Sequence, residues 1–256
     1  MAAESYRHEM RANLRLAWPI IAAQMSMVSM STVDTLLAGR LGATTLAAVA
    51  VGANIFFLVF VFFLGLFMAV SPIVAQQIGA RLAPEQTGQV LRGTLVLAVV
   101  AGALWSALLW VVGPPVLRLL SLSAAAEAGA LAYLHAVSLA PVGFCLAFTL
   151  RNAAEAHGLT RISLAAGVAG FVVNALAGWL LVFGHAGLPR MGAAGTGIAT
   201  SLAGWSMVVV YTLAYRRHPR LRPLRMLRPG RWASAAASRE VLRLGLPIAA
   251  ILTAEG

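Results

Sequence analysis

Residues 46–78 read LAAVAVGANIFFLVFVFFLGLFMAVSPIVAQQI and contain no charged side chain. A helix needs about 20 apolar residues to cross the roughly 30 Å hydrocarbon core of a bilayer, so this stretch is long enough to span a membrane. A backbone in lipid must satisfy its own hydrogen bonds, and the stretch lacks the alternation of a β-barrel strand. We therefore predict one long membrane helix over 46–78.

Similar apolar stretches lie on both sides of this helix. The chain has 60% hydrophobic and 11% charged residues, whereas soluble domains average about 25% charged residues. Clusters of Gly, Pro and Arg separate the stretches and predict turns between them. The predicted spans are 14–38, 46–78, 92–113, 128–150, 161–184 and 194–215, and another span begins near 241.

The expected fold is therefore an all-α integral membrane protein with a six-helix transmembrane lobe and the beginning of a seventh helix. The expected domains are an N-terminal lobe over 1–215, a basic linker over 216–240 and the start of a second lobe over 241–256. Seven of the twelve residues over 239–250 are identical to those over 11–22, with Pro247 aligned on Pro19, which predicts that the seventh span is a second copy of the first.

Positive charge is distributed unevenly among the connections. All 19 Lys and Arg positions are Arg, and the formal net charge is +11. Sixteen of the arginines lie in the N-terminal segment, 79–92, 151–161 and 216–243, and the other three are Arg40, Arg118 and Arg190. The positive-inside rule therefore places the N-terminus and the basic linker in the cytoplasm. There the arginines would meet anionic lipid headgroups, so we expect membrane lipids and no nucleic acid as partners.

Two carboxylates, Asp34 and Glu255, fall deep within apolar spans. A charged residue near the centre of a membrane helix costs about 2.5–3.5 kcal/mol, and such residues usually mark ion or substrate paths. We interpret both as candidate cation-coupling residues. The alternative for Asp34 is a structural carboxylic acid hydrogen-bonded between helices, and the alternative for Glu255 is a surface position.

Other polar residues in the spans are candidates for lining a cavity. Three of them fall on one side of the first span, next to Asp34 on a helical wheel. Two amides stand in otherwise apolar sequence, where an ordinary interhelical hydrogen bond is an equal alternative. The cavity candidates are Gln24, Ser31, Thr35, Asn54 and Asn174.

The remaining polar residues predict neither a metal site nor an enzyme. The five His show no metal-ligand spacing with Cys145 or the acidic residues, so we expect no metal and no cofactor. No nucleophile has a candidate base, so hydrolytic catalysis is not expected. Glu155 follows Arg151 by four residues, a spacing that predicts a solvated or interfacial ion pair.

Four segments resemble the multidrug and toxic compound extrusion (MATE) family of cation-coupled antiporters. The segments are VDTLLAG at 33–39 with Pro19 before it, LAAVAVG at 46–52 with PIVAQQIGA at 72–80, LRN at 150–152 through Glu155 and Gly158 to Asn174, and LGLPIAA at 244–250 with Glu255. The resemblance implies twelve helices in two six-helix lobes, so a C-terminal lobe beyond this chain is expected. Many relatives have a second Asn four residues after Asn174, where this chain has Gly178.

The resemblance implies that inward flow of H⁺ or Na⁺ drives the export of amphipathic organic cations, with alternating access of the two lobes. Asp34 would couple the cation in the first lobe, with Asn174 as its neighbour, and Glu255 would do so in the second. The expected location is a bacterial inner membrane. The alternatives are a flippase for lipids or lipid-linked precursors, a membrane-embedded transferase and a scaffold without transport, although the loops are too short for a transferase.

Overall fold

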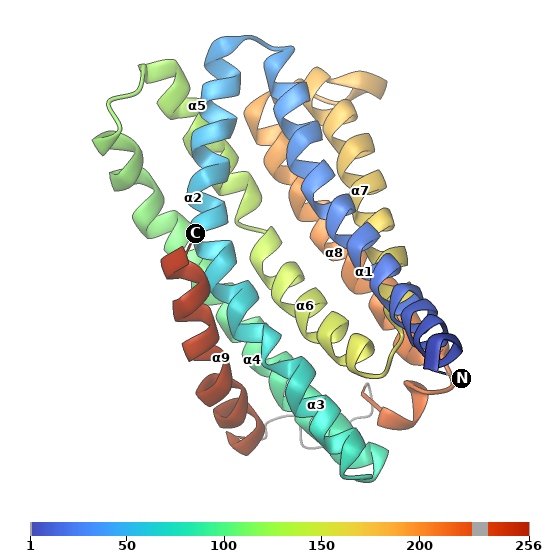
Figure 1. The fold of residues 1–256 in the computed structure, drawn as a ribbon. Helices are drawn as coiled ribbons and strands as arrows, with labels where there is room; N and C mark the ends of the chain where they lie inside the picture. The colour runs from blue at the N-terminus through green and yellow to red at the C-terminus, as the bar shows by residue number, and fades with distance from the viewer. Residues whose placement is uncertain (1, 227–234, 256) are drawn as a thin grey trace.

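The computed structural model describes residues 2–226 and 235–255 and contains no β-strand in these ranges. Its helices form an elongated bundle and run between the same two ends (Figure 1). Five helical segments are long and apolar enough to cross a membrane, and a bent helix pair makes a sixth. The expected all-α, multi-pass membrane protein is confirmed.

The helices follow one another in chain order, and all the connections up to α8 are short. They are α1 (Ala2–Gly39), α2 (Ala43–Met68), α3 (Val70–Gly79), α4 (Pro84–Leu119), α5 (Ala124–Val137), α6 (Ala140–Ala156), α7 (Thr160–Phe183), α8 (Ala193–Arg217) and α9 (Ala235–Glu255). Two short 3₁₀ helices, η1 (His185–Gly187) and η2 (Arg222–Leu224), lie in the connections.

The predicted single helix over 46–78 is wrong in one detail, because the helix is divided at Ala69 into α2 and α3. Pro72 has no N–H to donate to the carbonyl of Met68, the last residue of α2. The two helices still form one apolar segment of 37 residues, Ala43–Gly79. The segment therefore keeps the length that the sequence predicted for a span.

The predicted span over 128–150 is also divided, into α5 and α6, whose axes are bent by 46°. Pro141 cannot donate the hydrogen bond that would continue the helix. Neighbouring helices supply donors to the carbonyls at the break. The Ser106 hydroxyl of α4 donates to the carbonyl of Ser138 at 2.7 Å, and the Trp205 indole of α8 donates to the carbonyl of Leu139 at 3.0 Å.

Helix α4 is longer than the predicted span over 92–113 and passes through Pro114 and Pro115, where the sequence predicted a turn. The ring of proline fixes φ near −65°, a value that a helix also has, so two prolines near the end of a long helix remove hydrogen bonds without forcing a break. The turn instead lies after Leu119.

The helices pack in two groups. In the first group, α7 packs against both α1 and α8 and forms a three-helix layer. In the second, α2 packs against α5 and α9, and α4 packs against α6 and α9. Helix α8 also packs against α5 and α6, and so joins the two groups (Figure 1).

The second group has an aromatic core. Trp105 of α4 is fully buried, and its ring centroid lies 4.8 Å from that of Phe56 and 5.3 Å from that of Phe63. Phe144 and Phe148 of α6 extend the cluster. Apolar rings thus fill the space between α2, α4 and α6, whereas the buried Asp and Asn side chains lie in the layer of α1, α7 and α8.

The arginine-rich connections share one end of the bundle. Figure 1 shows the start of α1, the α3–α4 and α6–α7 connections and the end of α8 at the same end, and the α1–α2, α4–α5 and α7–α8 connections at the other. The structure therefore groups these connections as the arginine distribution predicted. Which end faces the cytoplasm stays a prediction.

Candidate functional site

The buried carboxylate of Asp34 is the centre of the candidate site. Asp34 lies near the C-terminal end of α1 and is 8% exposed. Asn174 of α7 donates a hydrogen bond from Nδ2 to Asp34 Oδ1 at 3.2 Å, and Thr200 of α8 donates one from Oγ1 to Asp34 Oδ2 at 2.9 Å. The carboxylate thus has a partner on each of the two helices packed beside it.

Small residues on α7 allow close contact with α1 on both sides of Asp34. A Cβ added at Gly178 would lie 2.8 Å from Leu37 Cδ1, and one added at Gly170 would lie 2.9 Å from Met30 Cε. Leu37 and Met30 are buried and lie about one helical turn to either side of Asp34. Apolar side chains therefore enclose the carboxylate in both directions along α1.

The site contains an acceptor that has no partner. Oδ1 of Asn174 is buried and forms no hydrogen bond within residues 2–226 and 235–255, while Nδ2 of the same amide serves Asp34. Leaving a buried acceptor unpaired costs about 1–3 kcal/mol. A proton on the Asp34 carboxyl group, or a monovalent cation beside it, would give Oδ1 a partner. The arrangement therefore suits reversible binding of H⁺ or Na⁺.

Of the predicted cavity-lining residues, only Asn174 is brought to Asp34. Ser31 and Thr35 are exposed on α1, where the Thr35 hydroxyl donates to the carbonyl of Ser31 at 2.9 Å. Asn54 is exposed on α2. The structure places these three outside the enclosed site, and a cavity-lining role for them stays a prediction.

Glu255, the second predicted coupling residue, is exposed in the last turn of α9. Helix α9 packs against α2, since a Cβ added at Gly65 would lie 2.7 Å from Ala249 Cα. Figure 1 shows that α9 ends about halfway along the bundle. Because Asp34 faces α7 and α8, the structure does not bring the two carboxylates together.

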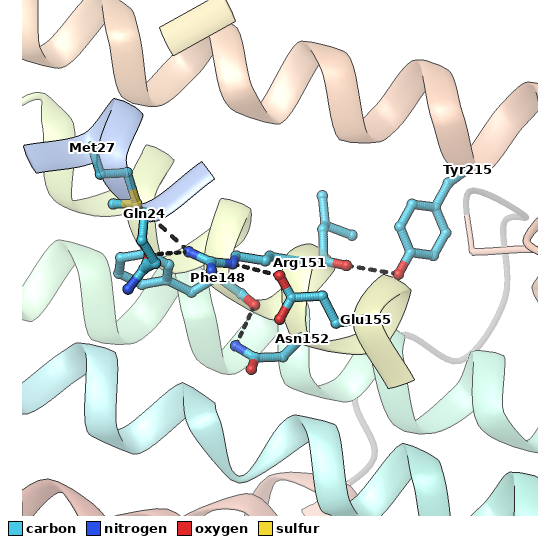
Figure 2. A network of polar contacts seen from close by, with 8 residues as sticks. Gln24, Met27, Phe148, Arg151, Asn152, Glu155 and Tyr215 are labelled. Carbon is cyan, nitrogen blue, oxygen red and sulfur yellow. Dashed lines mark hydrogen bonds and ion pairs between the residues drawn. The ribbon is translucent and has the colours of Figure 1, made fainter. Parts of the chain in front are cut away.

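Gln24, the remaining candidate, belongs to a second polar cluster around Arg151 of α6 (Figure 2). The Arg151 guanidinium donates from Nη1 to Gln24 Oε1 at 2.8 Å and from Nε to Glu155 Oε1 at 2.8 Å. The Arg151–Glu155 ion pair was predicted from the sequence, but as a solvated or interfacial pair. Its side chains are only 13% and 17% exposed, and α1 contacts the guanidinium through Gln24.

Thr200 is the site residue that the sequence did not reveal. Its single hydroxyl proton can instead be donated to the carbonyl of Thr196, which lies 3.1 Å away and one helical turn earlier. Threonines whose hydroxyl bonds to the carbonyl of the preceding turn are common in membrane helices, so a threonine in a span does not indicate a site. The span 194–215 also contains Thr196, Ser201, Ser206 and Thr212, so the hydroxyl of Thr200 does not stand out in the sequence.

The described part of the chain has no group of three or more His, Cys, Asp or Glu side chains placed to hold a metal ion. The expectation that the protein needs no metal and no other cofactor stays a prediction.

Comparison with known proteins gives a consistent result. The family model MatE matches residues 19–180. The Probable multidrug resistance protein NorM of Mesorhizobium japonicum is 36% identical over 264 residues, which cover 98% of this chain and 54% of the relative. The Multidrug resistance protein NorM of Vibrio vulnificus is 30% identical over 250 residues, which cover 96% of this chain and 54% of the relative.

A solved structure shows the same fold. The crystal structure of the eukaryotic MATE transporter AtDTX14 superposes with a TM-score of 0.87 at 22% identity, covering 98% of this chain and 54% of that one. The chain spans about half the length of the curated relatives that it matches. With its family model, its relatives and its fold in agreement, the chain belongs to the multidrug and toxic compound extrusion family, whose members are transporters and not enzymes, and it corresponds to the N-terminal half of such a transporter.

Proposed function

We propose that this chain is the first lobe of an antiporter in which entry of H⁺ or Na⁺ drives the export of amphipathic organic cations. The observation that carries the proposal is the enclosed Asp34 carboxylate, which has donors from two neighbouring helices and an unpaired acceptor beside it. A carboxyl group that alternates between dry and wet surroundings can bind and release a cation, because burial disfavours its charged form and a nearby positive charge favours it.

Two features support export of drugs by a two-lobe protein. The relatives are named as multidrug resistance proteins, and this chain covers about half of their length. A second lobe would begin with α9 and would carry Glu255 as its own coupling residue. The substrate would bind between the lobes, and alternating access would expose it to either side of the membrane. The location that we propose is a bacterial inner membrane, with the N-terminus in the cytoplasm.

The decisive experiment replaces Asp34 by Asn in the full-length protein. Asp34→Asn keeps the size of the side chain and most of its hydrogen-bonding capacity but removes the titratable charge. We expect the variant to fold and to lose gradient-driven export. The measurement is efflux of a fluorescent organic cation from proteoliposomes under an imposed pH or Na⁺ gradient, with expression and monodispersity checked in parallel.

The matched control is Glu127→Gln, which removes a carboxylate in the first turn of α5, whereas the hydrogen-bond donors to Asp34 lie on α7 and α8. It should export at the parental rate. If Asp34→Asn is well folded and also exports at the parental rate under both gradients, Asp34 is a structural residue and the proposal is wrong.

A further inference from the structure

A small pocket lies inside the bundle, on the side of Asp34 that is nearer to the start of α1. Helices α1, α6, α7 and α8 line it, mostly with apolar side chains, and the residues that matter here are Met27, Arg151, Ser163, Met207 and Tyr211. The space accommodates about one water molecule. No predicted site residue faces this pocket.

The pocket is lined by a buried hydroxyl group that lacks a partner. Ser163 of α7 is 1% exposed, and within the part of the chain that the structure describes its Oγ has no partner in hydrogen-bond geometry, although the hydroxyl of Tyr211 lies beside it. Tyr211 of α8 is 2% exposed and lines the same space. Because a buried polar atom without a partner costs about 1–3 kcal/mol, a water molecule in this pocket would stabilise the lobe.

The Arg151 cluster closes the pocket toward the start of α1. The guanidinium connects α6 to α1 through Gln24 Oε1, and its Nη1 lies 3.6 Å from Met27 Sδ (Figure 2). Glu155 binds Nε of the same guanidinium and neutralises its charge. The closure thus depends on hydrogen bonds of polar side chains, which can open without disturbing a packed apolar core.

Two methionines separate the pocket from Asp34. Met30 of α1 and Met207 of α8 are buried, and the ends of both side chains meet over Gly170 of α7. Methionine has an unbranched, flexible side chain that changes rotamer at low cost. The pair therefore lies between the Asp34 carboxylate and the pocket.

The three helices of this layer lead in the same order from the carboxylate to the pocket. Each helix passes from the carboxylate, past the methionines, to the pocket. The residues at these three points are 34, 30 and 27 on α1, 174, 170 and 163 on α7, and 200, 207 and 211 on α8. The eleven residues from Asn174 to Ser163 correspond to about 16 Å along a helix. The Asp34 site and the pocket therefore lie one after the other along the axis of the layer.

We propose that the pocket is a hydrated stage on a proton route between Asp34 and the end of the bundle where α1 begins, with Met30 and Met207 as its gate. The inference rests on the proposed antiport and specifies H⁺ as the coupling cation. Hydroxyl groups and a single water molecule can relay a proton. The same pocket contains no carboxylate and borders a guanidinium, so it is a poor ligand set for a metal cation.

The first test asks whether water occupies the pocket. X-ray radiolytic footprinting of the full-length protein in nanodiscs oxidises side chains next to bound water. Tyr211 should be modified. Its matched control is Tyr215, one turn later on α8, which is 3% exposed and donates from its hydroxyl to the carbonyl of Leu150 at 2.9 Å. Ser163→Leu, which fills the pocket, should abolish the modification of Tyr211. Equal modification of the two tyrosines, or none of either, would overturn the proposal.

The second test follows the proton. In proteoliposomes that contain a pH-sensitive dye and no drug, Met207→Ala should raise proton leak under a pH jump several-fold, and Met207→Leu should match the parent. Met30→Ala should have the same effect as Met207→Ala. It replaces Met207→Ala in the test if the Met207→Ala protein is not monodisperse. Adding Asp34→Asn to either alanine variant should abolish the leak. A leak that is unchanged in both alanine variants, or that persists without Asp34, contradicts the route.

The two proposals can fail separately. Parental export by Asp34→Asn refutes the coupling role of Asp34, whatever the footprinting shows. A dry pocket or a closed methionine gate refutes the proton route while export remains dependent on Asp34.

Discussion

The hydroxyl of Thr200 and the amide of Asn174 hold the Asp34 carboxylate from opposite oxygens. Sequence reasoning identified Asp34 because a charge in an apolar span is costly, and it identified Asn174 as a lone amide. It did not identify Thr200, whose hydroxyl can instead bond within its own helix. The helical wheel was misleading for Ser31 and Thr35, because the buried face of α1 carries Met30, Asp34 and Leu37 and leaves those two hydroxyls exposed.

This geometry predicts a graded series of variants at Thr200. Thr200→Val keeps the shape of the side chain but removes the hydrogen bond to Asp34, and a bond to a charged group contributes about 1.5–3 kcal/mol. We expect Thr200→Val to slow the initial rate of gradient-driven export by about tenfold or more, since 1.4 kcal/mol corresponds to a factor of ten. Thr200→Ser retains the hydroxyl and should transport close to the parental rate. Equal rates for the Val and Ser variants would show that the hydroxyl plays no part in coupling.

At the scale of the helices, the sequence predicted which segments cross the membrane but not where they bend. The length of an apolar stretch determines whether it can cross the membrane, and the sequence shows that length directly. Helix α1 continues through Pro19 and α4 through Pro114, yet the helices break just before Pro72 and Pro141. At the α5–α6 break the freed carbonyls find donors on α4 and α8, which are distant in sequence. The position of a bend therefore depends on tertiary partners that a local pattern does not contain.

The side chains at the α5–α6 break should contribute measurably to stability. Trp205→Phe keeps an aromatic ring but removes the donor to the carbonyl of Leu139, a loss of about 1 kcal/mol. For a chain of this size we expect the midpoint of thermal unfolding in detergent to fall by about 2–4 °C. The matched control is Trp179→Phe on α7, where the indole stacks on His185 with ring centroids 4.1 Å apart. If both variants unfold at the same temperature, the indole hydrogen bond does not support the bend.

At the scale of the whole molecule, the two groups of helices differ in what fills the space between their helices. Aromatic rings fill the group around α2, α4 and α6, whereas the layer of α1, α7 and α8 contains the enclosed carboxylate. Helix α9 joins the aromatic group through its packing on α2 and α4. A second lobe attached through α9 would therefore rest on the apolar group and leave the polar layer free to rearrange during coupling.

The orientation of the molecule follows from charge and connectivity together. The connections alternate between two ends, and 16 of the 19 arginines belong to the N-terminal segment, 79–92, 151–161 and 216–243. Because cytoplasmic loops are enriched in Lys and Arg, the end of the bundle where α1 begins should face the cytoplasm. We test this with single cysteines in a Cys145→Ala background, since Cys145 is fully buried. In intact cells, a membrane-impermeant maleimide should label Arg190→Cys, in the α7–α8 connection, and should reach Arg220→Cys, beyond α8, only after the membrane is opened. The opposite labelling pattern would show that the topology is inverted. The proton route would then lead from Asp34 to the side of the membrane away from the cytoplasm.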